Sequence, residues 1–128
     1  MFTLDQITRI HDRLGDAATL PDYVRTLKSI GVERYTSYVS DGHSEYVGTD
    51  GSMLASPAVH EKLAIAKASN RDQFLEHLRR HGERKTTYLE MSKGLADSGV
   101  EKWTVDTTAM TMAYYDTAGT ALLIEAIS

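Results

Sequence analysis

Residues 31–38 read GVERYTSY, and nearly the same phrase, GVEKWTVD, returns at residues 99–106. The two phrases lie 68 residues apart, and this offset holds without a gap when residues 19–54 are set against residues 87–122. An internal repeat of this length is typical of one supersecondary unit that occurs twice. The sequence therefore predicts two related units, and the elements within each unit decide the fold class.

The first unit begins with two predicted helices. Thr3 and Gln6 form a capping box at the start of the first helix, and Gly15 is placed to end it. The second helix begins near Thr19 and ends at Gly31, because glycine readily adopts the left-handed backbone conformation that a Cβ disfavours.

The second unit repeats this helix pair. Its first helix begins near Asn70, with Gln73 three residues later. Its second helix begins with the capping box of Thr87 and Glu90 and ends at Gly99, the counterpart of Gly31.

Three strands are predicted after each helix pair. The two quoted phrases supply the first strands, whose side chains alternate between the two faces. Asp41-Gly42 is a strong hairpin signal, and the turn of the second unit falls near Thr107. Residues around 55–62 are interpreted as an insertion, so the third strand of the first unit is placed after them. The predicted return strands and third strands cover residues 44–48, 110–116, 63–67 and 120–126.

Short local connections between such strands favour an antiparallel sheet with helices on one face. The predicted fold class is α+β, with two tandem αα-βββ repeats that are related by a pseudo-two-fold axis and form one sheet. The alternative is two separate three-stranded halves that pack together. Because neither half alone would bury its apolar face well, we expect a single domain over residues 1–128, with units at about 1–69 and 70–128.

The composition is that of a soluble globular protein, with 25% charged residues and a net charge of −4. Cysteine is absent, which excludes disulfides and thiolate chemistry. The N-terminal segment lacks the apolar core of a signal peptide, and no apolar run is long enough to cross a bilayer. We therefore expect a cytoplasmic protein with no cofactor and no membrane partner.

One cluster of basic residues runs against the acidic balance, and it is followed by a polar loop. Its residues could hold phosphate, but Glu76 and Glu83 balance them, and the net charge disfavours nucleic acid as a partner. The cluster consists of Arg79, Arg80, Arg84 and Lys85.

Aromatic residues concentrate on the predicted strands. Helices cover one face of the sheet, so alternation leaves some of these rings on the other face, where exposed aromatics mark ligand or partner surfaces. The alternative is core packing and cross-strand pairing. The candidate ligand- or partner-binding residues are Tyr35, Tyr38, Tyr46, Trp103, Tyr114 and Tyr115.

Two pairs of residues suggest catalytic chemistry instead. His77 and His81 have the i,i+4 spacing of helical zinc ligands, but no third ligand is specified, so no metal site is predicted. Glu33 and Glu101 occupy equivalent places in the repeat and could act as an acid–base couple across the pseudo-axis. The alternatives are a solvated helix edge for the histidines and exposed strand-edge acids for the glutamates.

The second unit also resembles a known family. Residues 88–127, with GVEKWTVD, AYYDTAG and TALLIEAI, are similar to small bacterial proteins called phage envelope proteins, the YbcV-like family or domain of unknown function 1398. The similarity extends over the chain through DYVRTLKSIGVERYTSYVSDG and KLAIAKASN. The resemblance implies a bacterial or phage-related protein of unsettled function, and it carries over no catalytic residue.

These observations favour a non-enzymatic binding or interaction module. It would use the strand aromatics at a sheet face or at the seam between the units, with a homodimer or a small-molecule ligand as its partner. The alternative is a small hydrolase-like or metal-assisted enzyme with a site near the pseudo-two-fold axis.

Overall fold

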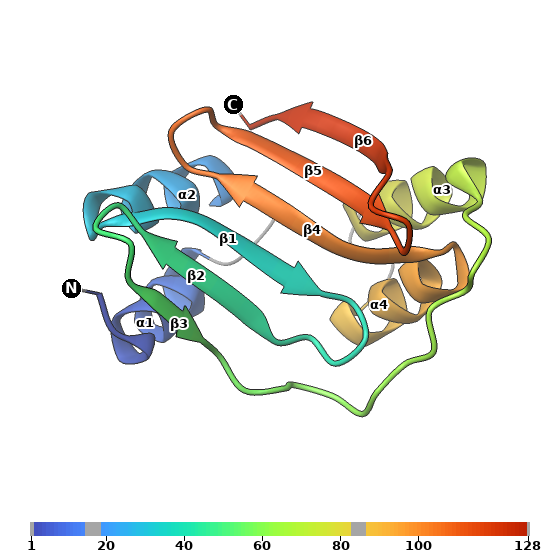
Figure 1. Ribbon diagram of the computed structural model, residues 1–128, viewed down its shortest axis with the longest axis horizontal. Helices are drawn as coiled ribbons and strands as arrows, with labels where there is room; N and C mark the ends of the chain where they lie inside the picture. The colour runs from blue at the N-terminus through green and yellow to red at the C-terminus, as the bar shows by residue number, and fades with distance from the viewer. Residues whose placement is uncertain (1, 15–18, 83–86, 128) are drawn as a thin grey trace.

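The computed structural model describes residues 2–14, 19–82 and 87–127 and confirms the α+β fold class (Figure 1). The order of elements αα-βββ occurs twice along the chain. The elements are α1 (Leu4–Leu14), α2 (Leu20–Ser29), β1 (Val32–Tyr38), β2 (Ser44–Gly48), β3 (Met53–Ala55), α3 (Arg71–Gly82), α4 (Tyr88–Asp97), β4 (Val100–Asp106), β5 (Thr111–Asp116) and β6 (Ala121–Ala126).

The six strands form one antiparallel sheet in the order β3-β2-β1-β4-β5-β6. In Figure 1 the sheet lies in front of all four helices, so the helices cover one of its faces. None of the described segments covers the opposite face, which is called the open face below. No described helix is long and apolar enough to span a bilayer.

The elements recur at the sequence offset of 68. Helix α4 begins and ends 68 residues after α2, and β4 begins and ends 68 residues after β1. Both central strands shift register at the residue after their first valine, Glu33 in β1 and Glu101 in β4. Thr36 lies opposite its counterpart Thr104, as expected for a pseudo-two-fold between β1 and β4. The tandem repeat itself stays a prediction.

Side chains at the helix starts explain where the helices begin. Thr3 and Gln6 form the predicted capping box before α1, with donor–acceptor distances of 2.8 and 3.2 Å. Thr87 and Glu90 form the same box before α4. Asn70 caps α3 through a 3.0 Å bond from the amide of Gln73. The predicted stop of α1 at Gly15 lies outside the described residues.

The helix that begins after Thr19 is tied differently. The Thr19 hydroxyl makes no cap bond to α2 and donates instead to the carbonyl of Leu14 at the end of α1, at 2.6 Å. Both second helices end as predicted, because Gly31 and Gly99 have φ angles of 101° and 84°.

The core consists of two clusters, one under each helix pair. The first joins α1 and α2 to the sheet through residues that include Ile7, Leu27 and Tyr35. The second joins α3 and α4 to the sheet through residues that include Phe74, Leu95 and Tyr114. Trp103 and Met112 pack against both clusters and so connect them across the sheet.

The predicted third strand of the first unit was wrong. The strand is β3, which follows β2 directly through the turn at Asp50-Gly51, and residues 63–67 form no strand. Asp50 closes this turn by accepting bonds from both the amide and the hydroxyl of Ser52. Leu63 and Ile65 alternate because they pack against the second core cluster, not because they pair with a strand.

Candidate functional site

The strand register defines which side chains lie on the open face. Residues that are paired across strands point to the same face, and the Tyr35–Tyr46 and Trp103–Tyr114 pairs lie in the core beneath the helices. The neighbouring positions therefore face away from the helices. They are Arg34, Thr36, Tyr38, Glu45, Val47, Met53, Ala55, Lys102, Thr104, Asp106, Thr111, Ala113, Tyr115, Ala121, Ile124 and Ala126.

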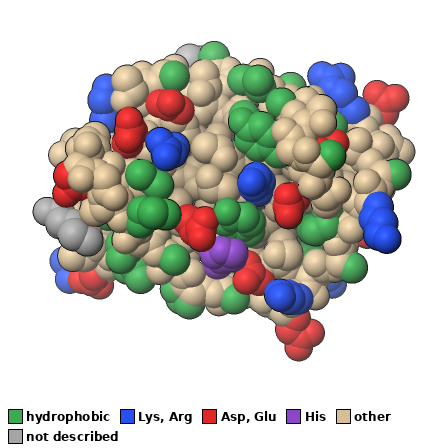
Figure 2. All heavy atoms as spheres, in the orientation of Figure 1, with side chains coloured by type: hydrophobic (Ala, Val, Ile, Leu, Met, Phe, Trp, Pro, Cys, Tyr) green, Lys and Arg blue, Asp and Glu red, His purple; other side chains and the backbone are tan. Residues whose placement is uncertain are grey.

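The centre of the open face is a pair of threonines. The hydroxyls of Thr36 and Thr104 lie 2.9 Å apart, where β1 and β4 meet. Arg34 lies opposite Asp106 on one side of this pair, and Lys102 lies opposite Tyr38 on the other. Figure 2 shows the result, a face on which charged side chains are interspersed with hydrophobic ones. Such a surface offers both ionic and apolar contacts.

Tyr38 is held in place from three sides. Its hydroxyl donates to Glu45 Oε1 at 2.8 Å, and its ring stacks on His43 with the centroids 4.4 Å apart. The ammonium of Lys102 lies 5.9 Å from the centre of the same ring. The bond to the Glu45 carboxylate raises the pKa of Tyr38, so the phenol stays protonated and keeps donating.

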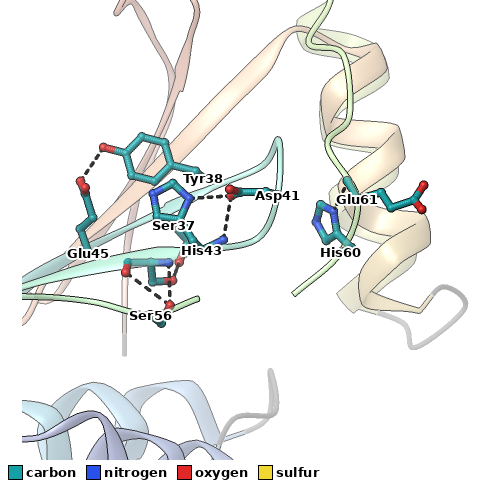
Figure 3. A network of polar contacts seen from close by, with 9 residues as sticks. Ser37, Tyr38, Asp41, His43, Glu45, Ser56, His60 and Glu61 are labelled. Atoms are coloured by element: carbon teal, nitrogen blue, oxygen red, sulfur yellow. Dashed lines mark hydrogen bonds and ion pairs between the residues drawn. The ribbon is translucent and has the colours of Figure 1, made fainter. Parts of the chain in front are cut away.

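The turn beyond Tyr38 is fixed by Asp41 (Figure 3). Its carboxylate accepts bonds from the amide of His43 at 3.0 Å and from the ring Nδ1 of His43 at 2.5 Å. These bonds hold the pKa of Asp41 below its usual value. The Asp41 carbonyl also accepts from the amides of Val59 and His60, which ties the connection after β3 to this turn.

Three serines lie beneath this turn (Figure 3). The hydroxyls of Ser37 and Ser44 are 2.7 Å apart, and Ser56 accepts a bond from the Ser44 amide at 2.8 Å. Ser37 and Ser44 are buried, so they fasten β1 to β2 and to the following connection. Sequence reasoning missed Asp41, His43 and Glu45, although the Asp41-Gly42 turn signal already implied that Tyr38 and His43 lie close together.

The six predicted aromatic residues divide between the two faces. Tyr35, Tyr46 and Tyr114 are buried beneath the helices, and burial raises the pKa of Tyr46 and Tyr114. Trp103 lies on the same face and packs against both core clusters. Tyr38 and Tyr115 lie on the open face, where a ligand or partner can reach them.

The two glutamates considered as a catalytic couple are not brought together. Glu33 and Glu101 lie at opposite ends of the β1–β4 pair, since their carbonyls accept from the amides of Thr107 and Val39 respectively. Six residues of strand separate the two positions, which corresponds to about 20 Å. The Glu33 carboxylate lies 3.8 Å from the guanidinium of its neighbour Arg34.

The histidines of α3 have a packing environment. A Cβ built on Gly94 would lie 2.5 Å from Nδ1 of His77, so the ring of His77 fills the space that glycine leaves in α4. Among the described residues, no group of three or more His, Asp or Glu side chains could hold a metal ion. In the basic cluster, Arg79 pairs with Glu76, while Arg84 and Lys85 lie outside the described residues.

Two small cavities are formed by described residues, and both lie away from the open face. One, of about 160 Å³, is lined by residues that include Phe2, Ile30 and Thr49. The other, of about 290 Å³, lies between α4 and the connection before α3, beside Leu63 and Lys93. Neither reaches the size of a typical pocket for a drug-sized ligand, about 300–1,000 Å³.

The geometry defines a class of α+β protein in which helices cover one face of a six-stranded sheet and leave a polar and aromatic face open. Residues 8–126 match the model of the family described as "Protein of unknown function (DUF1398)", and the chain belongs to that family. No curated protein matches the chain.

Proposed function

We propose that the chain is a non-enzymatic binding module whose open face docks on the surface of a partner protein. The observation that carries this proposal is the one-sided placement of the helices, which leaves a whole sheet face uncovered. That face has apolar residues at both edges, since Met53 on β3 is 67% exposed and Ile124 on β6 is 64% exposed.

The chemistry of the face suits a protein partner better than a small molecule. Tyrosine, methionine and arginine are enriched at protein interfaces, and Tyr115, Met53 and Arg34 are all available on this face. The two cavities lie elsewhere, so a small ligand would have to bind on a surface that does not enclose it.

The face is also pre-organised. Strand backbone carries most of its side chains, and Tyr38 is held by Glu45, His43 and Lys102 before any partner arrives. Ordering such groups in advance lowers the entropy cost of association. The proposal places the partner in the cytoplasm, and the narrower resemblance to phage envelope proteins adds no chemistry to it.

Site-specific photo-crosslinking in cells that naturally make the protein tests this proposal. A crosslinking amino acid in place of Tyr115 samples the open face, and the same amino acid in place of Lys28, an exposed residue of α2, samples the helix side. We expect Tyr115 to give a discrete adduct that Lys28 does not give.

The double variant Arg34→Glu with Lys102→Glu should abolish this adduct while its circular dichroism stays that of the wild type. The proposal fails if both positions give the same adducts, if the open face gives none, or if the adduct survives the double charge reversal.

A further inference from the structure

We propose that β6 pairs in antiparallel fashion with β6 of a second copy of this chain. The starting observation is a contrast between the two edge strands of the sheet. Strand β3 has three residues and is followed by Ser56-Pro57, whereas β6 has six residues and reads ALLIEA. Short strands, prolines and charges protect sheet edges from pairing with other chains. Strand β6 has a single charged residue, Glu125, and no proline.

The unpaired backbone groups of β6 can be assigned from its pairing with β5. The amide of Ile127 donates to the carbonyl of Met110, so Glu125 and Leu123 also direct their backbone groups toward β5. Ala126, Ile124 and Leu122 therefore direct theirs toward the outer edge. Nε of Arg71 donates to the Leu122 carbonyl at 2.9 Å, as expected for a carbonyl that faces outward.

Charge complementarity selects one register for the pair. If Ile124 lies opposite Ile124 of the second copy, Leu122 lies opposite Ala126 and Leu123 lies opposite Glu125 of that copy. Glu125 is paired with Met112, which packs in the core, so its side chain leans to the helix side, as does Arg71 at the start of α3. The carboxylate of each copy is then placed beside the Arg71 guanidinium of the other.

Other arrangements are less favourable. A register centred on Glu125 would set two carboxylates directly opposite each other, which destabilises an antiparallel pair. In the chosen register the Leu122 carbonyl can accept from both Arg71 and the second copy, because a carbonyl oxygen has two lone pairs. The product is one continuous sheet of twelve strands, six from each copy.

The expected dimer is weak and depends on concentration. A ladder of six residues is about 20 Å long, and it buries less than the roughly 800 Å² per partner of a standard interface. The pairing uses edge groups that the open-face proposal leaves unused, so the two proposals stand independently of each other.

Sedimentation equilibrium of the full chain from micromolar to millimolar concentration tests the pairing. We expect a monomer–dimer equilibrium, and Ile124→Lys should weaken the association by at least about tenfold, because it places two ammonium groups opposite each other. Met53→Lys is the matched control, since Met53 is equally exposed but lies on the other edge, and it should leave the association unchanged.

Charge exchange provides a second measurement that does not depend on Ile124. Arg71→Glu and Glu125→Arg should each weaken the dimer, and the double variant should restore it. Amide exchange of Ile124 and Ala126 should slow as the wild-type concentration rises. A wild-type monomer at millimolar concentration, or a dimer that Met53→Lys disrupts and Ile124→Lys does not, would overturn the proposal.

The two proposals can fail separately. The Arg71→Glu variant is expected to be monomeric and still to give the open-face adduct from position 115. Loss of the dimer with the adduct retained therefore supports the edge pairing, whereas absence of the adduct in a protein that dimerises counts against the open-face function alone.

Discussion

The two halves of the sheet have the same elements 68 residues apart, yet they end differently. Leu27 and Leu95 are counterparts, and both are completely buried. Beyond such shared positions the halves diverge, because the first half closes its hairpin with the Asp41–His43 contact and ends in the short β3, while the second ends in the longer β6. The shared positions thus support the backbone, and the differing positions determine which surfaces remain available.

The largest expected effect comes from the shared core positions. Leu27→Ala and Leu95→Ala should each lower the free energy of unfolding by about 2–5 kcal/mol, because each leaves a cavity at a site with no exposed surface. Urea denaturation followed by circular dichroism measures both. We expect one transition in each variant, since Trp103 and Met112 connect the two clusters. Two separated transitions would show instead that the halves unfold independently.

A second pair of counterparts should differ in its response. Gly31→Ala and Gly99→Ala both force alanine into a positive φ, at a cost of roughly 1–2 kcal/mol. A Cβ at Gly99 would also lie 2.7 Å from Cα of Ser69, whereas one at Gly31 meets nothing within 4 Å. Gly99→Ala should therefore destabilise the protein more in the same urea measurement. Equal losses would contradict the close packing of Ser69 against Gly99.

The helix starts offer a smaller contrast. Thr87→Ala should cost about 1 kcal/mol because it removes the side chain that caps the Glu90 amide, while Thr87→Ser should retain most of the stability. Amide hydrogen exchange locates the effect, with faster exchange expected at Glu90. Thr19→Ala, at the counterpart position, should leave the first turn of α2 unaffected because Thr19 makes no cap bond there. Faster exchange in α2 would contradict this assignment.

Local signals in the sequence were sufficient to predict most of the fold. Capping boxes at Thr3 and Thr87 and the glycines at 31 and 99 act within one turn of the chain, so their effect can be read from neighbouring residues. The third strand of the first half was misplaced because alternation at Leu63 and Ile65 looks the same whether it reflects a strand or packing against a core cluster.

The candidate site was less predictable because it depends on contacts between strands. The faces of Tyr38 and Tyr46 follow from strand register, and a shift of one residue would exchange them. The contact of His43 with Asp41 depends on the conformation of the turn, with Gly42 at a φ of 77°. The pairing of Thr36 with Thr104 depends on how the two halves meet.

The smallest effect concerns the two hairpin turns and depends on pH. Asp41→Asn removes the charge that His43 contacts, and it should cost less than about 1 kcal/mol at neutral pH. Since the pKa of Asp41 is lowered in the folded state, its contribution is present above the unfolded pKa of about 3.9 and is lost as the pH falls through the folded pKa. The stability difference between wild type and variant should therefore shrink in acid, as thermal melts from pH 7 to pH 2 would show. Asp106→Asn is the control, because the Asp106 carboxylate bonds the backbone amides of Thr108 and Ala109 in the other turn. A difference for Asp41→Asn that grows as the pH falls would mean that the charged carboxylate does not stabilise the first hairpin.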